Sequence, residues 1–338
     1  MGGEVLYREE FRLHSPKPYS HPESPERLDW ALEGVRLAGW PLREPGLGDT
    51  SLFLRVHARE YYEAVMRAAS QGEVVWLDPD TYVSPGTPRA LEALAGAVTD
   101  AVEIAARGEG PVAVLGRPPG HHAGRSGRGL GAPTLGFCVF NASALTAKLL
   151  SERGRTAVLD FDAHHGNGTQ DILWAEPVLH VDIHQDPSTI YPGTGFPSET
   201  GAPGLPVKAN ICVPPGAGDD IYADASRLAL SIISDYDPDY IVVSAGFDAY
   251  IGDTPFTELR ATSATFNLLG RLLSSYSERL VVVLEGGYSI GLREGLAAFL
   301  RGLEGREVDA GETTSSSGHA WEWYMRRRRE LLEAIGRG

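Results

Sequence analysis

A stretch rich in potential metal ligands lies at residues 160–170, which read DFDAHHGNGTQ. Its two carboxylates and two imidazoles fall within six consecutive positions. Asp162 and His164 are two residues apart, so their side chains point the same way on a locally extended backbone. One oxygen and one nitrogen ligand from a single turn suit zinc or a similar divalent ion. The alternative interpretation is a structural ion-pair cluster or a solvated turn. Further polar motifs beyond the ends of other predicted strands favour the metal site.

Two adjacent histidines, His121 and His122, form the second motif. They follow a buried strand predicted at 112–115 and stand beyond a rigid turn, residues 117–120, that reads RPPG. A lone histidine is most often structural. Two adjacent histidines beyond a strand end are better interpreted as groups that accept and donate protons.

Two later strands also end in polar residues. The apolar run 240–244 leads to Asp248, and the run 280–284 leads to Tyr288 on a glycine turn. Together with the aspartate and histidine of the first motif, Asp248 would complete three protein ligands and leave one position open for water, which the metal would acidify. Tyr288 would donate a hydrogen bond to a developing oxyanion. These parts predict metal-assisted hydrolysis of an amide or similar carbonyl group.

The elements that must position these motifs alternate between strands and helices. The run 155–159 predicts a buried strand before the first motif, and a helix near Gln170 would begin with Asn167 or Thr169 as its N-cap. Further strands are expected at 178–184 and 210–213, and further helices near Leu28 (N-cap Ser24, then Pro25), opening with residues 136–141, and at 88–107, 219–235, 258–276 and 290–303. This alternation predicts one parallel-sheet α/β domain, with ligands at the carboxyl ends of its strands.

Composition narrows the classes of function. The net charge of −15 argues against a general nucleic-acid binder, which would need a broad basic face. Two cysteines do not make a disulfide framework, so a reducing cytoplasm is the expected location. Neither a leader-like apolar segment nor a run of eighteen apolar residues occurs, so we expect neither export nor membrane spanning.

The 338 residues are expected to form a single domain, residues 1–338. Within it, residues 304–318 predict a flexible connection to a C-terminal helix at 320–336. The arginine run 326–329 predicts a solvated face of that helix, with an anion or partner site as the alternative.

The combined motifs resemble those of the histone deacetylase superfamily, which includes prokaryotic acetoin-utilisation proteins and acetylpolyamine amidohydrolases. The segments that carry the resemblance are residues 117–123, 136–141, 160–170, 183–195, 244–253 and 285–289. The resemblance implies the arginase/deacetylase α/β fold, with a central parallel sheet of about eight strands flanked by helices on both faces.

The resemblance also implies a role for each matching residue. One Zn²⁺ per chain would be bound by Asp162, His164 and Asp248. The catalytic residues would be His121, His122, Tyr288, Asp160 and Asn167. His122 would be the general base toward the metal-bound water, and His122 or His121 would protonate the leaving amine. Asp160 would orient His121, and Asn167 would orient His122 where many relatives carry aspartate.

Two further sites follow from the same resemblance. Substrate would contact Gly136, Phe137, Tyr191 and Gly286. A monovalent cation, K⁺ or Na⁺, would lie near Asp160, Asp162, His164, Asp182 and Ile183. Asp182 stands where relatives commonly carry serine, which puts the identity of that ion in question.

The expected activity is removal of an acetyl or other short acyl group from an acetyl-lysine, an acetylpolyamine or a small acyl-amine. A homo-oligomer is compatible with these expectations. An arginase-like binuclear manganese hydrolase is one alternative, although only Asp248 and Asp253 stand near the place where bridging carboxylates would be needed. A non-catalytic protein that binds acyl ligands or partners on the same fold is another alternative.

Overall fold

The computed structural model describes residues 2–311 and 313–337 and contains an eight-stranded sheet whose neighbouring strands are all parallel. The strand order is β10-β9-β8-β11-β12-β5-β1-β2. These strands are β1 (Glu4–Leu6), β2 (Leu42–Arg43), β5 (Val112–Val114), β8 (Thr156–Asp160), β9 (Val178–Gln185), β10 (Lys208–Val213), β11 (Tyr240–Ala245) and β12 (Leu280–Leu284).

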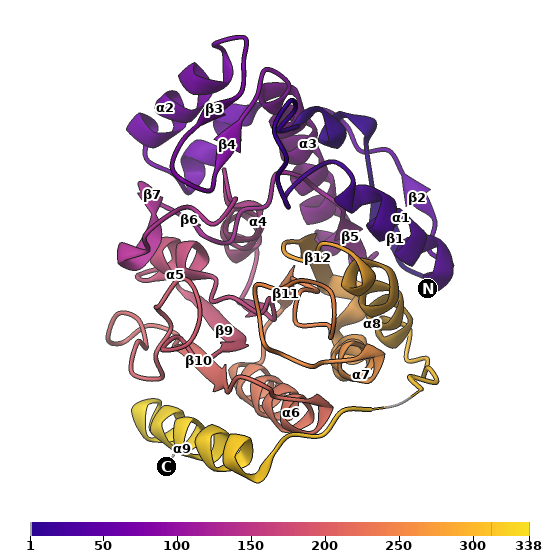
Figure 1. Cartoon of the computed structure of the whole chain (residues 1–338), viewed down its shortest axis with the longest axis vertical. Helices are drawn as coiled ribbons and strands as arrows, with labels where there is room; N and C mark the ends of the chain where they lie inside the picture. The colour runs from indigo at the N-terminus through magenta and orange to yellow at the C-terminus, as the bar shows by residue number, and fades with distance from the viewer. Residues whose placement is uncertain (1, 312, 338) are drawn as a thin grey trace.

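Helices cover both faces of the sheet (Figure 1). On one face α3 (Thr87–Ala106) packs against α4 (Ala142–Ser151), and α4 contacts α5 (Asn167–Leu173). The other face carries α1 (Arg27–Ala38), α6 (Asp219–Tyr236), α7 (Ser263–Leu273) and α8 (Leu296–Leu303). The predicted α/β fold with a parallel sheet of about eight strands is therefore confirmed.

Shorter elements connect this framework. Two small antiparallel ribbons pair β3 with β4 and β6 with β7. The remaining elements of the described residues are α2 (Arg59–Ala69), α9 (Gly318–Ala334), β3 (Val75–Trp76), β4 (Tyr82–Val83), β6 (Ala123–Gly124), β7 (Gly127–Arg128), four 3₁₀ segments (Glu9–Leu13, Thr50–Arg55, Gly129–Gly131, Ser274–Arg279) and a π-helical turn (Gly291–Gly295).

The central strands are buried along their whole length, which explains their continuous apolar sequences. Every residue of β8, β11 and β12 is buried. A parallel sheet covered by helices on both faces favours such runs over the alternating pattern of a half-exposed sheet. Strands β1 and β2 were not predicted, because two or three residues carry too little pattern to recognise.

The predicted starts of two helices, α5 and α1, were wrong. Neither Asn167 nor Thr169 caps α5, which begins at Asn167 after Gly166. The Asn167 amide oxygen contacts His122, and the Thr169 hydroxyl contacts other buried groups. Helix α1 begins at Arg27 after Glu26, so Ser24 and Pro25 lie in the preceding turn.

Three predicted helices differ in extent. Residues 258–262 are not helical, because the backbone amides of Arg260 and Ala261 donate to neighbouring loops and Thr262 caps α7. The helix predicted at 290–303 opens with the π-helical turn before α8. The C-terminal helix covers Gly318–Ala334 rather than 320–336.

The C-terminal helix α9 lies against β10 (Figure 1). Hydrogen bonds from Thr314 and Ser316 to Asp219 and Asp220 connect the segment before it to the start of α6. The domain assignment and the flexibility of residues 304–318 stay predictions. In the described part of the chain, no helix combines the length and apolar character needed to cross a lipid bilayer.

Candidate active site

The polar motifs meet at one edge of the sheet. Strands β8, β11, β12 and β5 are neighbours in space although not in sequence, and they run parallel. The segments beyond their carboxyl ends therefore lie together. Asp160 closes β8, while Asp248, Tyr288 and His121 follow β11, β12 and β5 within a few residues.

A buried group of two carboxylates and one imidazole occupies this edge. The ligand atoms of Asp162, His164 and Asp248 lie within 4.8 Å of one another. His164 Nδ1 is 3.1 Å from Asp162 Oδ1 and 2.9 Å from Asp248 Oδ2. Although burial disfavours its charge, the carboxylates of Asp162 and Asp248 raise the pKa of His164 to about 10, so this point strongly attracts positive charge. The donor set fits a divalent zinc-like ion, which would take the place of that proton.

Two glycines let the backbone approach this group closely. A Cβ atom on Gly246 would lie 2.0 Å from Asp162 Oδ2, and one on Gly286 would lie 2.3 Å from the same oxygen. The Gly286 amide also donates to Asp162 Oδ2 at 2.8 Å. Gly286 therefore holds a carboxylate of the metal-capable group, and its expected contact with substrate stays a prediction.

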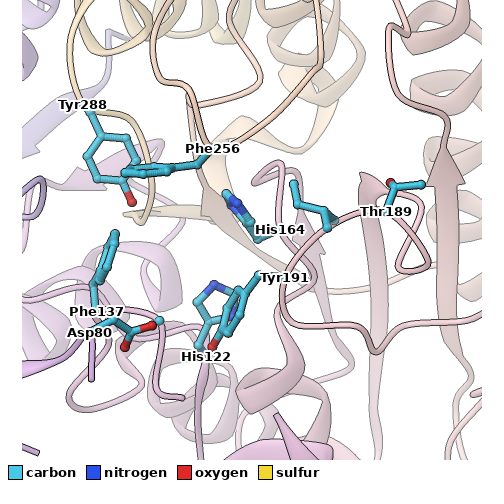
Figure 2. Close-up of a pocket in the computed structure, with 10 residues that line it drawn as sticks. Asp80, His122, Phe137, His164, Thr189, Tyr191, Phe256 and Tyr288 are labelled. Carbon is cyan, nitrogen blue, oxygen red and sulfur yellow. The ribbon is translucent and has the colours of Figure 1, made fainter. Parts of the chain in front are cut away.

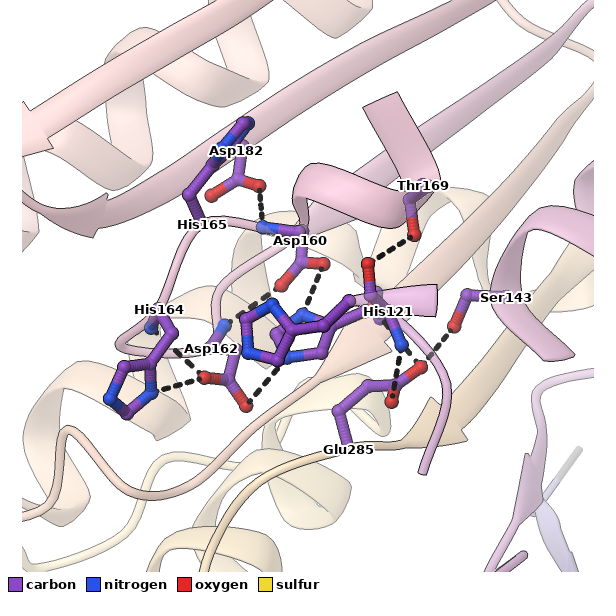
Figure 3. Close-up of polar contacts among 12 residues, drawn as sticks. His121, Ser143, Asp160, Asp162, His164, His165, Thr169, Asp182 and Glu285 are labelled. Carbon is purple, nitrogen blue, oxygen red and sulfur yellow. Dashed lines mark hydrogen bonds and ion pairs between the residues drawn. The ribbon is translucent and has the colours of Figure 1, made fainter. Parts of the chain in front are cut away.

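The two histidines lie side by side, and each has its own orienting partner (Figure 3 shows the first of them). His121 Nδ1 is 3.1 Å from Asp160 Oδ2, and His122 Nδ1 is 2.7 Å from Asn167 Oδ1. Because the Asn167 amide nitrogen donates to Gly129 O at 2.8 Å, its oxygen faces His122 and can only accept. His122 Nδ1 must therefore carry a proton, which leaves Nε2 free to accept another.

The pKa values of these histidines move in opposite directions. Burial would lower the pKa of His121, but the carboxylates of Asp162 and Asp160 outweigh it and raise this pKa well above its ordinary value. Burial lowers the pKa of His122 well below its ordinary value, and the positive charges of His121 and His164 add to the effect. A cationic histidine beside a neutral one is an arrangement suited to proton transfer.

A cavity of about 430 Å³ opens above these groups (Figure 2). The predicted residues His122, His164, Gly136, Phe137, Tyr191 and Tyr288 all line it. The Tyr288 hydroxyl points into the space between Phe137 and His164. A Cβ atom on Gly136 would lie 2.5 Å from the His122 ring, so glycine is needed where the backbone passes the base. Burial raises the pKa of Tyr288 well above its usual value, so this hydroxyl keeps its proton for donation.

Several residues at the cavity were missed by sequence reasoning. Asp80, Thr189 and Phe256 line it, together with Ile190. They stand in loops with no repeating pattern, and only the position of Thr189 near Tyr191 offered a signal. Arg27 of α1 is also buried; it donates to the Gly287 carbonyl, and its guanidinium lies 5.0 Å from the Tyr288 ring centre.

Glu285 is a further buried carboxylate beside the histidines (Figure 3). It accepts hydrogen bonds from the backbone amides of Gly120 at 2.8 Å and His121 at 3.1 Å, and from the Ser143 hydroxyl at 2.7 Å. The end of β12 therefore holds the turn that carries the histidine pair.

The residues predicted around a monovalent cation are in part brought together. Asp182 and Ile183 lie on β9, and Asp182 pairs in register with Asp160 of β8. The side chains of Asp160, His180 and Asp182 form a second buried group of potential ligands. Asp182 also accepts a hydrogen bond from His184 Nδ1 at 2.6 Å. Carboxylate oxygens suit a hard cation, and its identity as K⁺ or Na⁺ stays a prediction.

Comparison with known proteins gives a consistent result. Residues 21–303 match the family model described as histone deacetylase domain. A probable deacetylase of Archaeoglobus fulgidus is 35% identical, over 85% of this chain and 81% of the relative. An acetylpolyamine amidohydrolase of Burkholderia pseudomallei is 32% identical, over 82% and 92%. The crystal structure of the HDA15 HD domain superimposes with a TM-score of 0.83 at 28% identity, covering 98% of this chain and 95% of that one.

Proposed function

This chain belongs to the histone deacetylase family, and we propose that it is a zinc-dependent amidohydrolase that removes an acetyl or other short acyl group from an amine. One observation carries the proposal. The buried group of Asp162, His164 and Asp248 reaches, through His164, a cavity that His122 and Tyr288 also line. A Lewis acid site, a base and a hydroxyl donor at one cavity are the parts that amide hydrolysis requires.

A zinc ion held by Asp162, His164 and Asp248 would polarise the amide carbonyl and make water a stronger acid when bound. His122 is neutral and has Nε2 free, so it accepts the proton of the attacking water. His121 Nδ1 lies 3.1 Å from Asp160, whose carboxylate favours the protonated ring, so a protonated His121 can stabilise the negative charge that develops. The leaving amine receives its proton from His122 or His121.

The residues that line the cavity suit an extended acyl-amine substrate. Phe137 and Tyr191 provide aromatic surface around the reacting group, and the Tyr288 hydroxyl donates to the carbonyl oxygen as it gains charge. An extended acyl-amine, such as an acyl-lysine side chain or an acetylated polyamine, suits this shape. Relatives named deacetylase and acetylpolyamine amidohydrolase support the same reaction class.

Metal analysis combined with a substrate panel tests the proposal. The purified full chain should bind one zinc ion and cleave at least one member of a panel of acyl-lysines, acetylpolyamines and acyl-anilides. Two tightly bound manganese ions per chain would instead favour the arginase-like alternative. Zinc-loaded protein that cleaves no member of the panel would favour a non-catalytic binding protein.

A further inference from the structure

Helix α9 lies beyond the family match, which ends at residue 303. It nevertheless contacts Asp186, which stands three positions before a segment that lines the cavity. Asp186 follows β9 directly and is fully buried. Its Oδ2 accepts hydrogen bonds from Trp323 Nε1 at 2.7 Å and Arg327 Nε at 2.6 Å, and its Oδ1 lies 3.2 Å from Arg327 Nη2. The prediction that the whole arginine run forms a solvated face is therefore wrong for Arg327, which is only partly exposed.

Asp186 in turn shapes the loop that follows it. Its carboxylate accepts a hydrogen bond from Ser188 N at 3.0 Å. Its backbone carbonyl accepts from Thr189 N at 2.9 Å and from the Thr189 hydroxyl at 2.7 Å. Thr189, Ile190 and Tyr191 then line the cavity. Only two residues separate the carboxylate held by α9 from the cavity wall.

The neighbouring Gln185 connects the end of β9 to a second segment that lines the cavity, at Phe256. Its side-chain nitrogen donates to the Thr189 hydroxyl at 3.1 Å. Its side-chain oxygen accepts from the Thr257 hydroxyl at 3.0 Å and from Glu258 N at 3.1 Å. Phe256, directly before these residues, lines the cavity. Gln185 and Asp186, at the end of β9, therefore contact two segments that line the cavity, residues 189–191 and the one at Phe256. Helix α9 in turn contacts Asp186.

The charge on Asp186 depends on α9. Although burial opposes ionisation, the Arg327 guanidinium and the Ser188 hydroxyl lower the pKa of Asp186 to about 2. A buried carboxylate that loses its cation must find water or another donor, which requires the chain around it to move. The metal-capable group stands on the segments after β8 and β11. The Gln185 backbone amide donates to the Ala163 carbonyl beside this group at 2.9 Å, whereas the hydrogen bonds of the Asp186 side chain run to Ser188, Trp323 and Arg327.

We propose that Arg327 and Trp323 are positioning residues for substrate binding, which act through Asp186 on the cavity wall formed by residues 189–191. The proposal rests on the proposed amidohydrolase function, because its kinetic effect is read from that reaction. Loss of the contact should disturb the wall, and hence substrate affinity, more than the chemistry at the metal-capable group.

The test compares Arg327→Ala in the zinc-loaded full chain with a matched control from the same helix. Arg328→Ala removes a contact to Asp224 of α6 at 3.1 Å but none to Asp186. With an acetyl-lysine aminocoumarin reporter, we expect Arg327→Ala to raise KM roughly tenfold with kcat within about twofold, and Arg328→Ala to change neither. Trp323→Phe, which removes only one donor to Asp186, should shift KM in the same direction by less.

A readout independent of turnover keeps the two proposals apart. Amide hydrogen exchange followed by mass spectrometry should show faster exchange within residues 186–192 in Arg327→Ala, and Arg327→Lys should restore part of the protection. The exchange measurement does not require cleavage of the reporter. Faster exchange in Arg327→Ala without any cleavage would therefore support the positioning role and contradict only the proposed function. Unchanged KM and exchange in Arg327→Ala, or equal changes in Arg328→Ala, would show that α9 only covers the sheet edge and would overturn the inference.

Discussion

Replacement of Glu285 by alanine should damage both stability and catalysis, because three buried donors depend on this carboxylate. The amides of Gly120 and His121 and the hydroxyl of Ser143 lie 2.7–3.1 Å from its oxygens. A hydrogen bond to a charged group contributes about 1.5–3 kcal/mol, and each buried donor left unpaired costs about 1–3 kcal/mol. With water able to satisfy part of this loss, we expect Glu285→Ala to reduce the free energy of unfolding by about 3–6 kcal/mol.

The catalytic effect should follow from movement of the histidine turn. Glu285 holds the backbone of His121, whose ring contacts Asp160. A displacement near 1 Å in such a constellation can slow the reaction about 10²-fold. We therefore expect kcat of Glu285→Ala to fall by one to two orders of magnitude, with a smaller change in KM.

The isosteric variant Glu285→Gln separates hydrogen bonding from charge. Its amide oxygen can still accept from both backbone amides, and its nitrogen can donate to the Ser143 hydroxyl, so the loss of stability should be about 1–2 kcal/mol. Urea unfolding and steady-state kinetics of the zinc-loaded protein measure both quantities. If the free energy of unfolding of Glu285→Ala stays within about 1 kcal/mol of that of the unaltered protein and its kcat within about twofold, the carboxylate does not hold the turn as argued.

Three further predictions concern the metal, the hydroxyl donor and pH. Asp248→Ala should lose zinc and activity together, measured by metal analysis and turnover; a variant that keeps stoichiometric zinc would contradict the assigned ligand. Tyr288→Phe should retain zinc but lower kcat by roughly 10²–10³, as expected for loss of an oxyanion donor, and full activity would remove that role. Burial lowers the pKa of His57 to about 4, so this neutral side chain stabilises the fold above its unfolded pKa near 6.5 and the benefit is lost as pH falls toward 4. Between pH 7 and pH 5 this linkage amounts to about 2 kcal/mol. Urea unfolding of His57→Gln should show a correspondingly weaker pH dependence, and an identical slope would contradict the linkage.

The reacting groups could be proposed from sequence because the information is local. Apolar β-branched runs predict buried strands, and each run is followed within a few residues by a conspicuous polar motif, such as Asp162 with His164 or the pair at His121. In a parallel sheet, such motifs share one edge whatever the order of the strands. Segment types and the edge that carries the site are therefore encoded in short stretches of chain.

What only the tertiary structure decided is which residues meet across long separations in sequence. The strand order that places β8 beside β11 and β12 beside β5 is set by packing of the whole sheet, and it brings Asp248 to Asp162. Loop residues such as Asp80 and Phe256 have no periodicity, so their presence at the cavity could not be predicted.

The same limit explains the wrong assignments. Asn167 and Arg327 have side chains that suit a helix cap and a solvated helix face, respectively. Each is instead committed to a distant partner, His122 for Asn167 and Asp186 for Arg327. Local propensities are worth about 1 kcal/mol or less. A buried histidine or carboxylate without a partner costs more than that, so the partner in space prevails over the pattern in sequence.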